Sequence, residues 1–363
     1  MKLLLDGRAL QPELDGIGRF TSAVAGRLCR IRPDWDITLL VSPHSTHHVP
    51  GGGLKLESCP VPRFVPGEKR KLSPTVSRIS PRVYCSFSMA GPTWRGIPAC
   101  FTIHDLMVLE MEGYFGPSGL RNALYRMWFG HIILRSAEEA ACIVVPTRWV
   151  RDRVCARFPN ASTKTVVVYE GQDLFEPGSP PSARSGDFML YVGNGRSYKN
   201  VTRLLKAYSD ASARTGLPRL VMVVRRDRAF PSVVGAIARL GLESKVDLLS
   251  AVSEGRLKEL YSNCLAFLSP SISEGFGLPV VEAMAAGAPV LASRGTALEE
   301  VAGDGALLVD PTSVEAISRG ISELASDSAM REELSLRARA RASGFSWDSS
   351  AAAYAGLLEE AGR

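Results

Sequence analysis

The sequence predicts an α/β protein with two doubly wound parallel sheets. Short apolar runs alternate with helical stretches along the whole chain, which is typical of parallel strands joined by crossover helices. A stretch rich in proline, serine and glycine, residues 175–186, separates these runs into two series. At 363 residues, the chain is long enough for two hydrophobic cores. We therefore expect one domain over residues 1–172 and a second domain over residues 173–346.

The expected elements follow from the apolar runs in order. In the first domain, the expected strands are Lys2–Leu5, Ile37–Val41, Ala99–Thr102 and Cys142–Val145. In the second domain, they are Phe188–Val192, Leu220–Val224, Val246–Leu248, Ala266–Leu268 and Pro289–Ala292. Helical stretches are expected over Phe20–Arg30, Leu120–Arg135, Val201–Ala211 and residues 345–360. Ligands of such sheets bind beyond the carboxyl ends of the strands, so the loops there are the first candidates for a site.

Composition excludes several classes of protein. No apolar run is long enough to span a bilayer. The first apolar run is too short for a signal peptide, and the acidic Asp6 follows it directly. The seven cysteines are scattered and form no C-x-x-C pair. This pattern argues against a zinc site and a disulfide framework, and it favours the cytoplasm as the compartment.

Positive charge is concentrated in the first domain. Residues 1–172 carry 22 Lys and Arg against 14 Asp and Glu, whereas residues 173–363 carry 21 against 23. No nucleic-acid motif accompanies this charge, so we expect no nucleic-acid partner. A solvated loop, an anionic acceptor or a peripheral contact with the inner face of a membrane all remain open for the basic patch, as does membrane contact for the amphipathic stretch 120–135. The residues of the patch are Arg63, Lys69, Arg70, Lys71, Arg78 and Arg82.

The most informative segment is a glycine loop that leads into a helix and carries two carboxylates. Gly275 and Gly277 permit tight backbone conformations, and Pro279 suits the first turn of a helix. Glu274 precedes that helix, and Glu282 lies about one turn inside it. The unpaired N–H groups of the helix start favour an anion such as a phosphate, and carboxylates can bind sugar hydroxyls. The layout suits a sugar nucleotide, although a turn before a buried helix is the simpler alternative.

A second loop offers cations to the same anion. Residues 191–200 follow the first strand of the second domain and contain Asn194, Arg196 and Lys199 around a glycine turn. Two cations held at a strand end can neutralise a leaving diphosphate. Solvated side chains are the usual alternative for Arg and Lys.

Two segments of the first domain complete the candidates. Gly16 and Gly18 follow the first strand and precede a helix, which directs backbone N–H groups toward an anion. This turn is not a G-x-G-x-x-G fingerprint, so a nicotinamide cofactor is not favoured. His104 and Asp105 follow the strand Ala99–Thr102 at its carboxyl end. We expect Asp105 to order its loop, and Thr147 to cap a helix.

Together these motifs resemble the retaining glycosyltransferases of family four, which have the GT-B fold. Residues 273–287 resemble the family's E-x7-E signature, and residues 193–200 its basic loop. The resemblance implies two Rossmann-like domains facing a cleft, an acceptor-binding first domain joined by the crossover segment 347–363, and a donor-binding second domain. It implies a nucleotide-sugar co-substrate, such as a GDP-, UDP- or dTDP-sugar, and no tightly bound cofactor.

The resemblance also implies roles for particular residues. Glu282 would bind the ribose and Glu274 a hydroxyl of the donor sugar, while His104 would lie against that sugar. Arg196 and Lys199 would hold the diphosphate during a front-face, metal-independent transfer. Further donor contacts are implied for Gly16, Gly18, Asn194, Phe276, Gly277 and Leu278.

Two patterns that could bind a metal are not expected to do so. Asp34-Trp35-Asp36 matches a D-x-D motif but precedes a strand, at the end of the sheet away from the ligand edge. His44, His47 and His48 lie in a Pro/Ser/Gly stretch with no nearby acid or cysteine.

The donor sugar, the acceptor and the oligomeric state stay open at this point. A nucleotide-sugar epimerase and a non-catalytic sugar-nucleotide-binding subunit are the alternatives to a transferase. The segments 42–98 and 107–120, on the acceptor side, match no signature.

Overall fold

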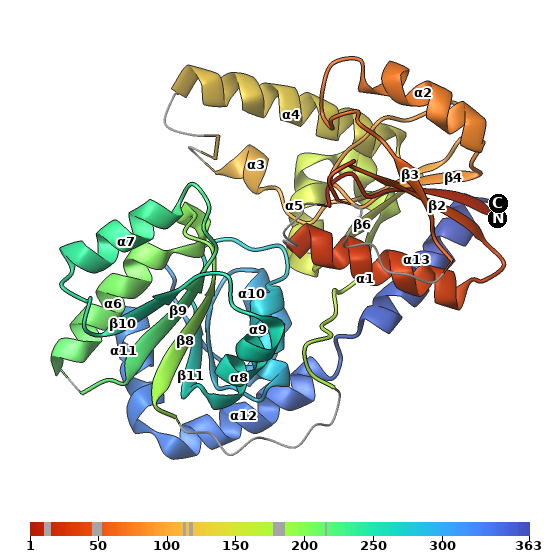
Figure 1. Ribbon diagram of the computed structural model, residues 1–363. Helices are drawn as coiled ribbons and strands as arrows, with labels where there is room; N and C mark the ends of the chain where they lie inside the picture. Colours follow the sequence, from red (N-terminus) through yellow and green to blue (C-terminus); the bar gives the residue numbers. More distant parts are fainter. Residues whose placement is uncertain (11–15, 46–52, 112–113, 116–118, 177–185, 215) are drawn as a thin grey trace. The chain divides into compact units, whose positions relative to one another are not determined.

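The chain divides into two compact units, each built around one parallel β-sheet (Figure 1). The computed structural model describes residues 1–10, 16–45, 53–111, 114–115, 119–176, 186–214 and 216–363. Unit 1 comprises Met1–Gly171 with Trp347–Arg363, and unit 2 comprises Gln172–Ser346. Most of the predicted linker lies outside the described residues. The predicted fold class, two Rossmann-like α/β domains, is confirmed.

Unit 1 contains a seven-stranded sheet with the order β3-β2-β1-β4-β5-β6-β7. Its strands are β1 (Lys2–Asp6), β2 (Asp36–Val41), β3 (Lys55–Ser58), β4 (Val83–Ser86), β5 (Ala99–Thr102), β6 (Cys142–Val145) and β7 (Thr165–Val167). The central strands are almost entirely buried, as expected of a parallel sheet covered on both faces.

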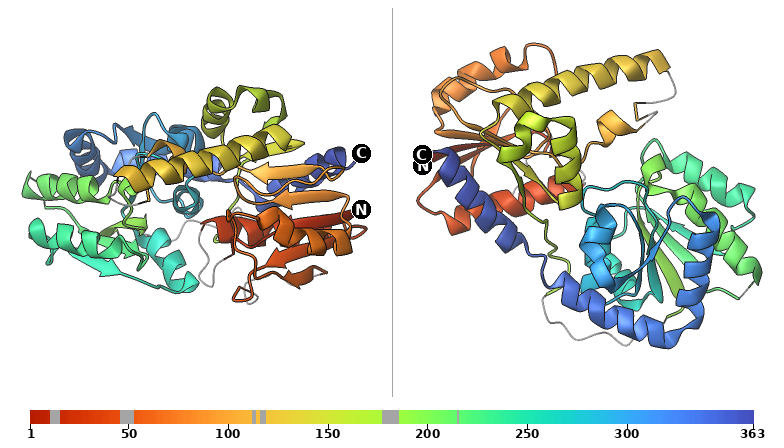
Figure 2. Two further views of the ribbon diagram at one scale, coloured as in Figure 1. Left: turned by 90° about the horizontal axis from the view of Figure 1, so that it is seen from above. Right: turned by 180° about the vertical axis from the view of Figure 1, so that it is seen from behind.

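The helices of unit 1 come from both ends of the chain. They are α1 (Gly16–Ile31), α2 (Glu68–Ile79), α3 (Met107–Glu110), α4 (Gly119–Glu139), α5 (Arg148–Arg157) and α13 (Trp347–Ala361). Helix α13 packs along α1 and contacts β4 and β5. Figure 2 shows the two chain termini side by side at one end of this unit.

Unit 2 contains a six-stranded sheet with the order β10-β9-β8-β11-β12-β13. In this order the first strand, β8, is central. Strands β9 and β10 are added on one side of it and β11 to β13 on the other, which is the strand order of the dinucleotide-binding fold. The strands are β8 (Phe188–Gly193), β9 (Arg219–Val224), β10 (Val246–Leu249), β11 (Ala266–Ser269), β12 (Val290–Ser293) and β13 (Ala306–Val309).

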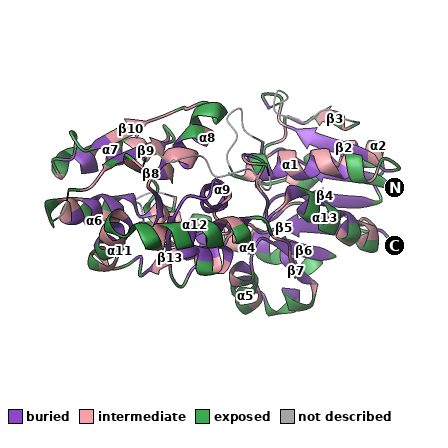
Figure 3. Ribbon diagram, turned by 90° about the horizontal axis from the view of Figure 1, so that it is seen from below, coloured by how far each residue is buried: buried purple, intermediate pink, exposed green. Residues whose placement is uncertain are grey.

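Helices cover both faces of this second sheet. The helices are α6 (Val201–Arg214), α7 (Phe230–Arg239), α8 (Glu254–Asn263), α9 (Leu278–Ala285), α10 (Ala297–Ala302), α11 (Val314–Ser326) and α12 (Ser328–Ala342). Met189 and Tyr191 of β8 pack with α6, α7 and α11, whereas Leu190 packs with α8, α9 and α10. The alternation follows from the two-residue period of a strand, and Figure 3 shows the buried strands between helices with exposed outer faces.

Every strand expected from the sequence is present, with ends shifted by at most a few residues. Among the described residues, four further strands, β3, β4, β7 and β13, were not predicted. Two of them, β3 and β4, lie within the segment 42–98, which also contains α2. β3 is an exposed edge strand with charged residues, and β7 has only three residues, so neither has the apolar run that marks the central strands.

Candidate functional site

The candidate site begins with two loops that lie at the same edge of the sheet in unit 2. β8 and β11 are parallel neighbours, so the loops that follow them meet beyond their carboxyl ends. The Ile272 N–H donates to the Tyr198 carbonyl over 2.7 Å. The side-chain amide of Asn200 donates to the carbonyls of Pro270, at 2.8 Å, and Pro311, at 2.7 Å. These bonds fix the loop after β8 against the loops after β11 and β13.

Lys199 and Glu274 form an ion pair between these two loops. The distance from Lys199 Nζ to Glu274 Oε1 is 2.7 Å, and the two side chains are only 13% and 10% exposed. Burial alone would lower the pKa of Lys199, but the nearby Glu274 carboxylate outweighs burial and raises it. Lys199 is therefore a buried cation at neutral pH. Its charge is compensated by Glu274, which the sequence marked as a candidate site residue without indicating this ion pair.

Asn194 and Arg196 have different surroundings from Lys199. The Asn194 side-chain carbonyl accepts the Arg196 N–H at 3.1 Å, and its amide donates to the Tyr198 hydroxyl at 3.2 Å. The Arg196 side chain is half exposed, and its Nε lies 3.5 Å from Asp227 Oδ2. Asn194 thus shapes the loop, while Arg196 keeps an accessible guanidinium.

The loop after β11 turns into α9 at a glycine that no other residue could replace without strain. Gly277 has a φ of +99° and a ψ of 55° at the start of the helix. A Cβ atom there would lie 2.3 Å from Leu298 Cδ2, because the loop approaches α10 closely. The Phe276 ring is buried and packs edge-on against Phe345 with centroids 5.4 Å apart. Side-chain packing therefore holds the backbone at the start of α9.

Glu282 lies inside α9 and is buried. Its Oε2 accepts a hydrogen bond from the Tyr261 hydroxyl of α8 at 2.9 Å. A buried carboxylate requires hydrogen-bond donors to offset the loss of water, and the Tyr261 hydroxyl is one such donor. The structure thus brings Glu274 to Lys199 and Glu282 to Tyr261.

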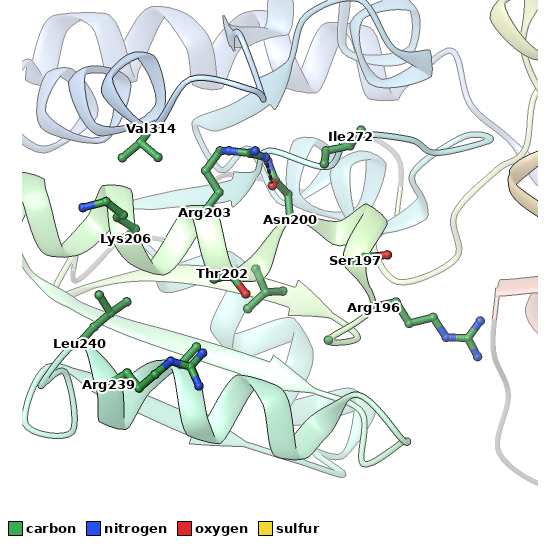
Figure 4. A pocket seen from close by; sticks show the side chains of 13 residues that line it. Arg196, Ser197, Asn200, Thr202, Arg203, Lys206, Arg239, Leu240, Ile272 and Val314 are labelled. Atoms are coloured by element: carbon green, nitrogen blue, oxygen red, sulfur yellow. Dashed lines mark hydrogen bonds between the residues drawn. The ribbon is translucent and has the colours of Figure 1, made fainter. Parts of the chain in front are cut away.

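A pocket of about 530 Å³ lies between α6 and α7 in unit 2 (Figure 4). Arg239, the last residue of α7, and Leu240, which follows it, line the pocket opposite Thr202 of α6. The side chain of Arg203 turns to Asn200. None of Lys199, Glu274 and Glu282 lines the pocket, so it flanks the ion pair rather than containing it.

In unit 1, the predicted residues lie on two different segments. Gly16 and Gly18 are in the first turn of α1, while the preceding Asp15 lies outside the described residues. His104 follows β5 at the carboxyl edge of the sheet, as predicted. The Asp105 side chain accepts the Met107 N–H at 2.9 Å, so it orders the start of α3 as expected. Thr147 caps α5 by accepting the Val150 N–H at 3.2 Å, which confirms that prediction.

His104 has a carboxylate partner that the sequence did not reveal. Its Nδ1 lies 3.0 Å from Glu170 Oε1, and both side chains are almost fully buried. Burial disfavours the imidazolium, but the hydrogen bond and charge of Glu170 outweigh it and raise the pKa of His104. The predicted site residue is therefore one half of a buried pair.

The two aspartates of the D-x-D pattern have other partners. Asp34 pairs with Arg32 at 3.0 Å, and Asp36 pairs with Lys55 at 2.8 Å at the amino end of β2. His44 is exposed, and His47 and His48 lie outside the described residues. Across the described parts of the chain, no group of three or more His, Cys, Asp or Glu could hold a metal ion.

Sequence reasoning missed the partners of the site residues. Glu170, Tyr198, Asp227 and Tyr261 each bind a predicted residue but carry no motif of their own. Tyr198 stands inside the basic loop and could have been noticed there. Glu170 and Asp227 lie in loops and Tyr261 in α8, each 21 or more positions from its partner, so only the fold identifies them.

Comparisons with known families match both units. Residues 176–341 match the family described as glycosyl transferases group 1, and residues 16–175 match the one described as glycosyltransferase family 4. The chain is 36% identical over 377 residues to the O-antigen chain mannosyltransferase B of Escherichia coli. That alignment covers 96% of this chain and 97% of the relative.

Solved structures share the fold at low sequence identity. Sucrose-phosphate synthase from Thermosynechococcus elongatus superposes with a TM-score of 0.77 at 19% identity, over 99% of this chain and 98% of that one. Anabaena HepE in complex with UDP gives a TM-score of 0.72 at 16% identity, over 99% of both chains.

Proposed function

The chain belongs to the glycosyl transferases group 1, and on that premise we propose that it transfers a mannosyl group from a nucleotide-sugar donor to a saccharide hydroxyl with retention of configuration. It is a glycosyltransferase of the GT-B type. Mannose is supported by the E. coli relative, which is an O-antigen chain mannosyltransferase. A nucleotide-sugar donor is supported by the neighbouring structure solved with UDP. A growing polysaccharide or lipid-linked saccharide is the acceptor class that we propose.

The observation that carries this proposal is the buried ion pair of Lys199 and Glu274 at the carboxyl edge of unit 2. A cation and a carboxylate held together beyond the strand ends can bind the diphosphate and a sugar hydroxyl of one donor. Arg196 adds a second, accessible cation. Backbone N–H groups from Phe276 to Leu278 at the start of α9 add partial positive charge.

The remaining donor contacts follow the family roles. Glu282 would bind the ribose hydroxyls through the carboxylate that Tyr261 orients. Asn194 and Gly277 would shape the loops around the diphosphate. In unit 1, His104 would contact the donor sugar, and Gly16 and Gly18 would present N–H groups at the start of α1.

The proposed chemistry takes place on one face of the sugar. The bond from the anomeric carbon to the phosphate oxygen breaks, and the acceptor oxygen bonds to that carbon from the same side. The departing phosphate oxygen accepts the proton of the acceptor hydroxyl. Lys199, Arg196 and the start of α9 stabilise the charge that develops on the phosphate, so they contribute most in the transition state.

The test is transfer by the purified protein. GDP-, UDP- and dTDP-sugars are supplied with saccharide acceptors, and the product linkage is determined by NMR. Glu274→Gln is expected to abolish transfer and leave the fold intact, whereas Glu259→Gln, a surface carboxylate paired with Arg256, should behave as wild type. Full turnover in Glu274→Gln would reject the E-x7-E assignment. Epimerised donor without transfer would favour an epimerase, and donor binding without turnover would favour a non-catalytic subunit.

We further propose that helix α4 contacts an anionic lipid surface. In the part of the chain that the structure describes, no helix has both the length and the apolar character needed to cross a bilayer. α4 nevertheless exposes large apolar side chains, with Leu120 75%, Leu124 59% and Met127 71% exposed. Phe64 and Trp128 line an apolar hollow of about 680 Å³ beside this face. Arg121 lies at the hollow, and the neighbouring α2 carries exposed Lys69, Arg70 and Lys71.

This combination suits an anionic lipid surface. The apolar side chains can insert between the lipids, and the cations attract the anionic headgroups.

Vesicle flotation tests this second proposal. Leu124→Ser with Met127→Ser should reduce binding to vesicles that contain phosphatidylglycerol, and raised salt should reduce it further. Leu336→Ser is the matched control, because Leu336 is 73% exposed on α12 of unit 2. Equal binding of the double variant and wild type would reject α4 as the contact surface.

A further inference from the structure

Glu170 is a buried carboxylate that the proposed mechanism does not otherwise use. It is 5% exposed and lies directly before Gly171, the last residue of unit 1 before the chain passes into unit 2. Its neighbour Tyr169 is held by α13, since the Ser350 hydroxyl donates to the Tyr169 carbonyl over 2.6 Å. This bond holds the backbone next to Glu170, and the Glu170 carboxylate lies 3.0 Å from His104 Nδ1.

His104 is enclosed by aromatic side chains. The Phe20 ring of α1 meets the imidazole edge-on with centroids 4.8 Å apart. Phe20 itself packs against Phe87 at 5.5 Å and against Trp347 at 5.7 Å. These aromatic side chains restrict the ring, while the polar contacts of the ring come from Glu170 and from the Phe87 backbone.

The two ring nitrogens have unequal surroundings. Glu170 takes Nδ1, whereas Nε2 is buried and has no hydrogen bond of ordinary geometry within the described residues. Asp105 is the other carboxylate whose charge acts on the ring, and its Oδ1 accepts a hydrogen bond from the Met107 N–H. The Phe87 carbonyl also favours the charged ring. A carboxylate on one nitrogen fixes which nitrogen carries the proton and how the ring is turned.

We infer that Glu170 is a positioning residue that orients His104 and keeps its Nδ1 protonated, so that the opposite edge of the ring faces the donor sugar. This inference rests on the proposed role of His104. Because Glu170 holds Nδ1, Nε2 is the nitrogen that remains for the sugar. A misplacement of about 1 Å at a reacting centre can cost on the order of 100-fold in rate.

The first test reads the pair without any turnover. The chain has five histidines, so a spectrum of ¹⁵N-labelled histidine is simple, and His104→Gln assigns the His104 signals. In the wild type, His104 should titrate above its ordinary pKa of 6.5 and carry the proton on Nδ1. In Glu170→Gln, which keeps the side-chain shape, the midpoint should move down. An unchanged midpoint and proton position in this variant would overturn the inference.

The second test separates positioning from folding. Glu170→Ala should lower kcat on the order of 10- to 100-fold with the donor KM unchanged, and Glu170→Asp should recover part of the loss. The control is Glu359→Gln, which removes a carboxylate of the same unit from its pair with Arg32 and should leave kcat and the His104 titration unchanged. Wild-type kcat in Glu170→Ala would overturn the inference. If the wild type transfers no sugar, the proposed function fails, but the titration still reports on the pair.

Discussion

Lys199 and Glu274 determine the charge of the candidate donor site before any ligand binds. Burying a lone ion costs several kcal/mol, so each of these side chains requires the other while the site is empty. A bound diphosphate would give Lys199 a second anion and leave Glu274 oxygens available for a sugar hydroxyl. The pair therefore keeps a cation in place until the donor arrives.

Replacing Lys199 should lower both the rate and the stability, because Glu274 also loses the partner that compensates its buried charge. In Lys199→Ala, a charge facing the leaving phosphate is lost, and kcat should fall on the order of 10²- to 10³-fold, which is about 3–4 kcal/mol. Steady-state kinetics measures the fall in kcat. Thermal unfolding measures how much stability is lost when the buried Glu274 carboxylate has no partner. Lys258→Ala, which removes a cation paired with Glu254 on the surface of α8, is the control. A wild-type rate in Lys199→Ala would make Lys199 a structural cation only.

The His104–Glu170 pair predicts a pH dependence of stability. The folded pKa of His104 lies above its ordinary value of 6.5, so the folded protein holds this proton more tightly than the unfolded chain does. The stabilisation is complete below about pH 6.5 and is lost as pH rises through the folded pKa. Urea unfolding between pH 6 and 9 should show the free energy of unfolding falling less steeply in Glu170→Gln than in wild type. Parallel curves would contradict a raised pKa.

Single residues also show the limit of prediction from sequence. Lys199 and Glu274 were both identified, because each stands in a recognisable motif beside a strand end. Glu170 was not, because it follows β7, a strand of three residues, and meets its partner 66 positions away. A pairing between distant segments depends on strand order, which local sequence patterns do not encode.

Helix α9 shows how an element depends on one backbone conformation. Gly277→Ala would place a Cβ against Leu298 at a φ of +99°, so strain and overlap add. We expect a loss on the order of 2–4 kcal/mol in the free energy of unfolding, and weaker donor binding because the start of α9 must shift.

Gly241→Ala separates the backbone strain at positive φ from the overlap of an added Cβ with a neighbour. Gly241 also has a positive φ, +62°, but an added Cβ would meet nothing within 4 Å. Strain alone should cost about 1 kcal/mol there. Chemical denaturation measures both variants, and equal losses would mean that the contact with Leu298 relaxes freely.

Elements differed in how far the sequence predicted them. Most of the central strands were predicted, because their buried positions require unbroken apolar runs. The central strand β4 was missed, because its four residues, which end in Ser86, form only a short apolar run. The edge strand β3 was missed because half of its sheet environment is solvent, which admits Lys55 and Glu57. The assignment of unit 1 to the acceptor and unit 2 to the donor stays a prediction.

At the scale of the molecule, the charge arrangement predicts transfer without a metal ion. Lys199, Arg196 and the start of α9 supply positive charge, and the described residues contain no cluster of three potential metal ligands. Product formation should be the same with and without EDTA. Loss of activity in chelator, followed by recovery with Mn²⁺ or Mg²⁺, would contradict this and return attention to Asp34 and Asp36.

The return of α13 to unit 1 has a consequence for biosynthesis. The ribosome completes all of unit 2 before it releases the helix that carries Trp347 and Tyr354. Until then, the Phe20 ring lacks two of its aromatic neighbours, and the surface beside β4 and β5 is uncovered. The half of the protein that is made first is therefore the half that finishes folding last, and its apolar surface is exposed to chaperones and to aggregation for as long as unit 2 is being translated.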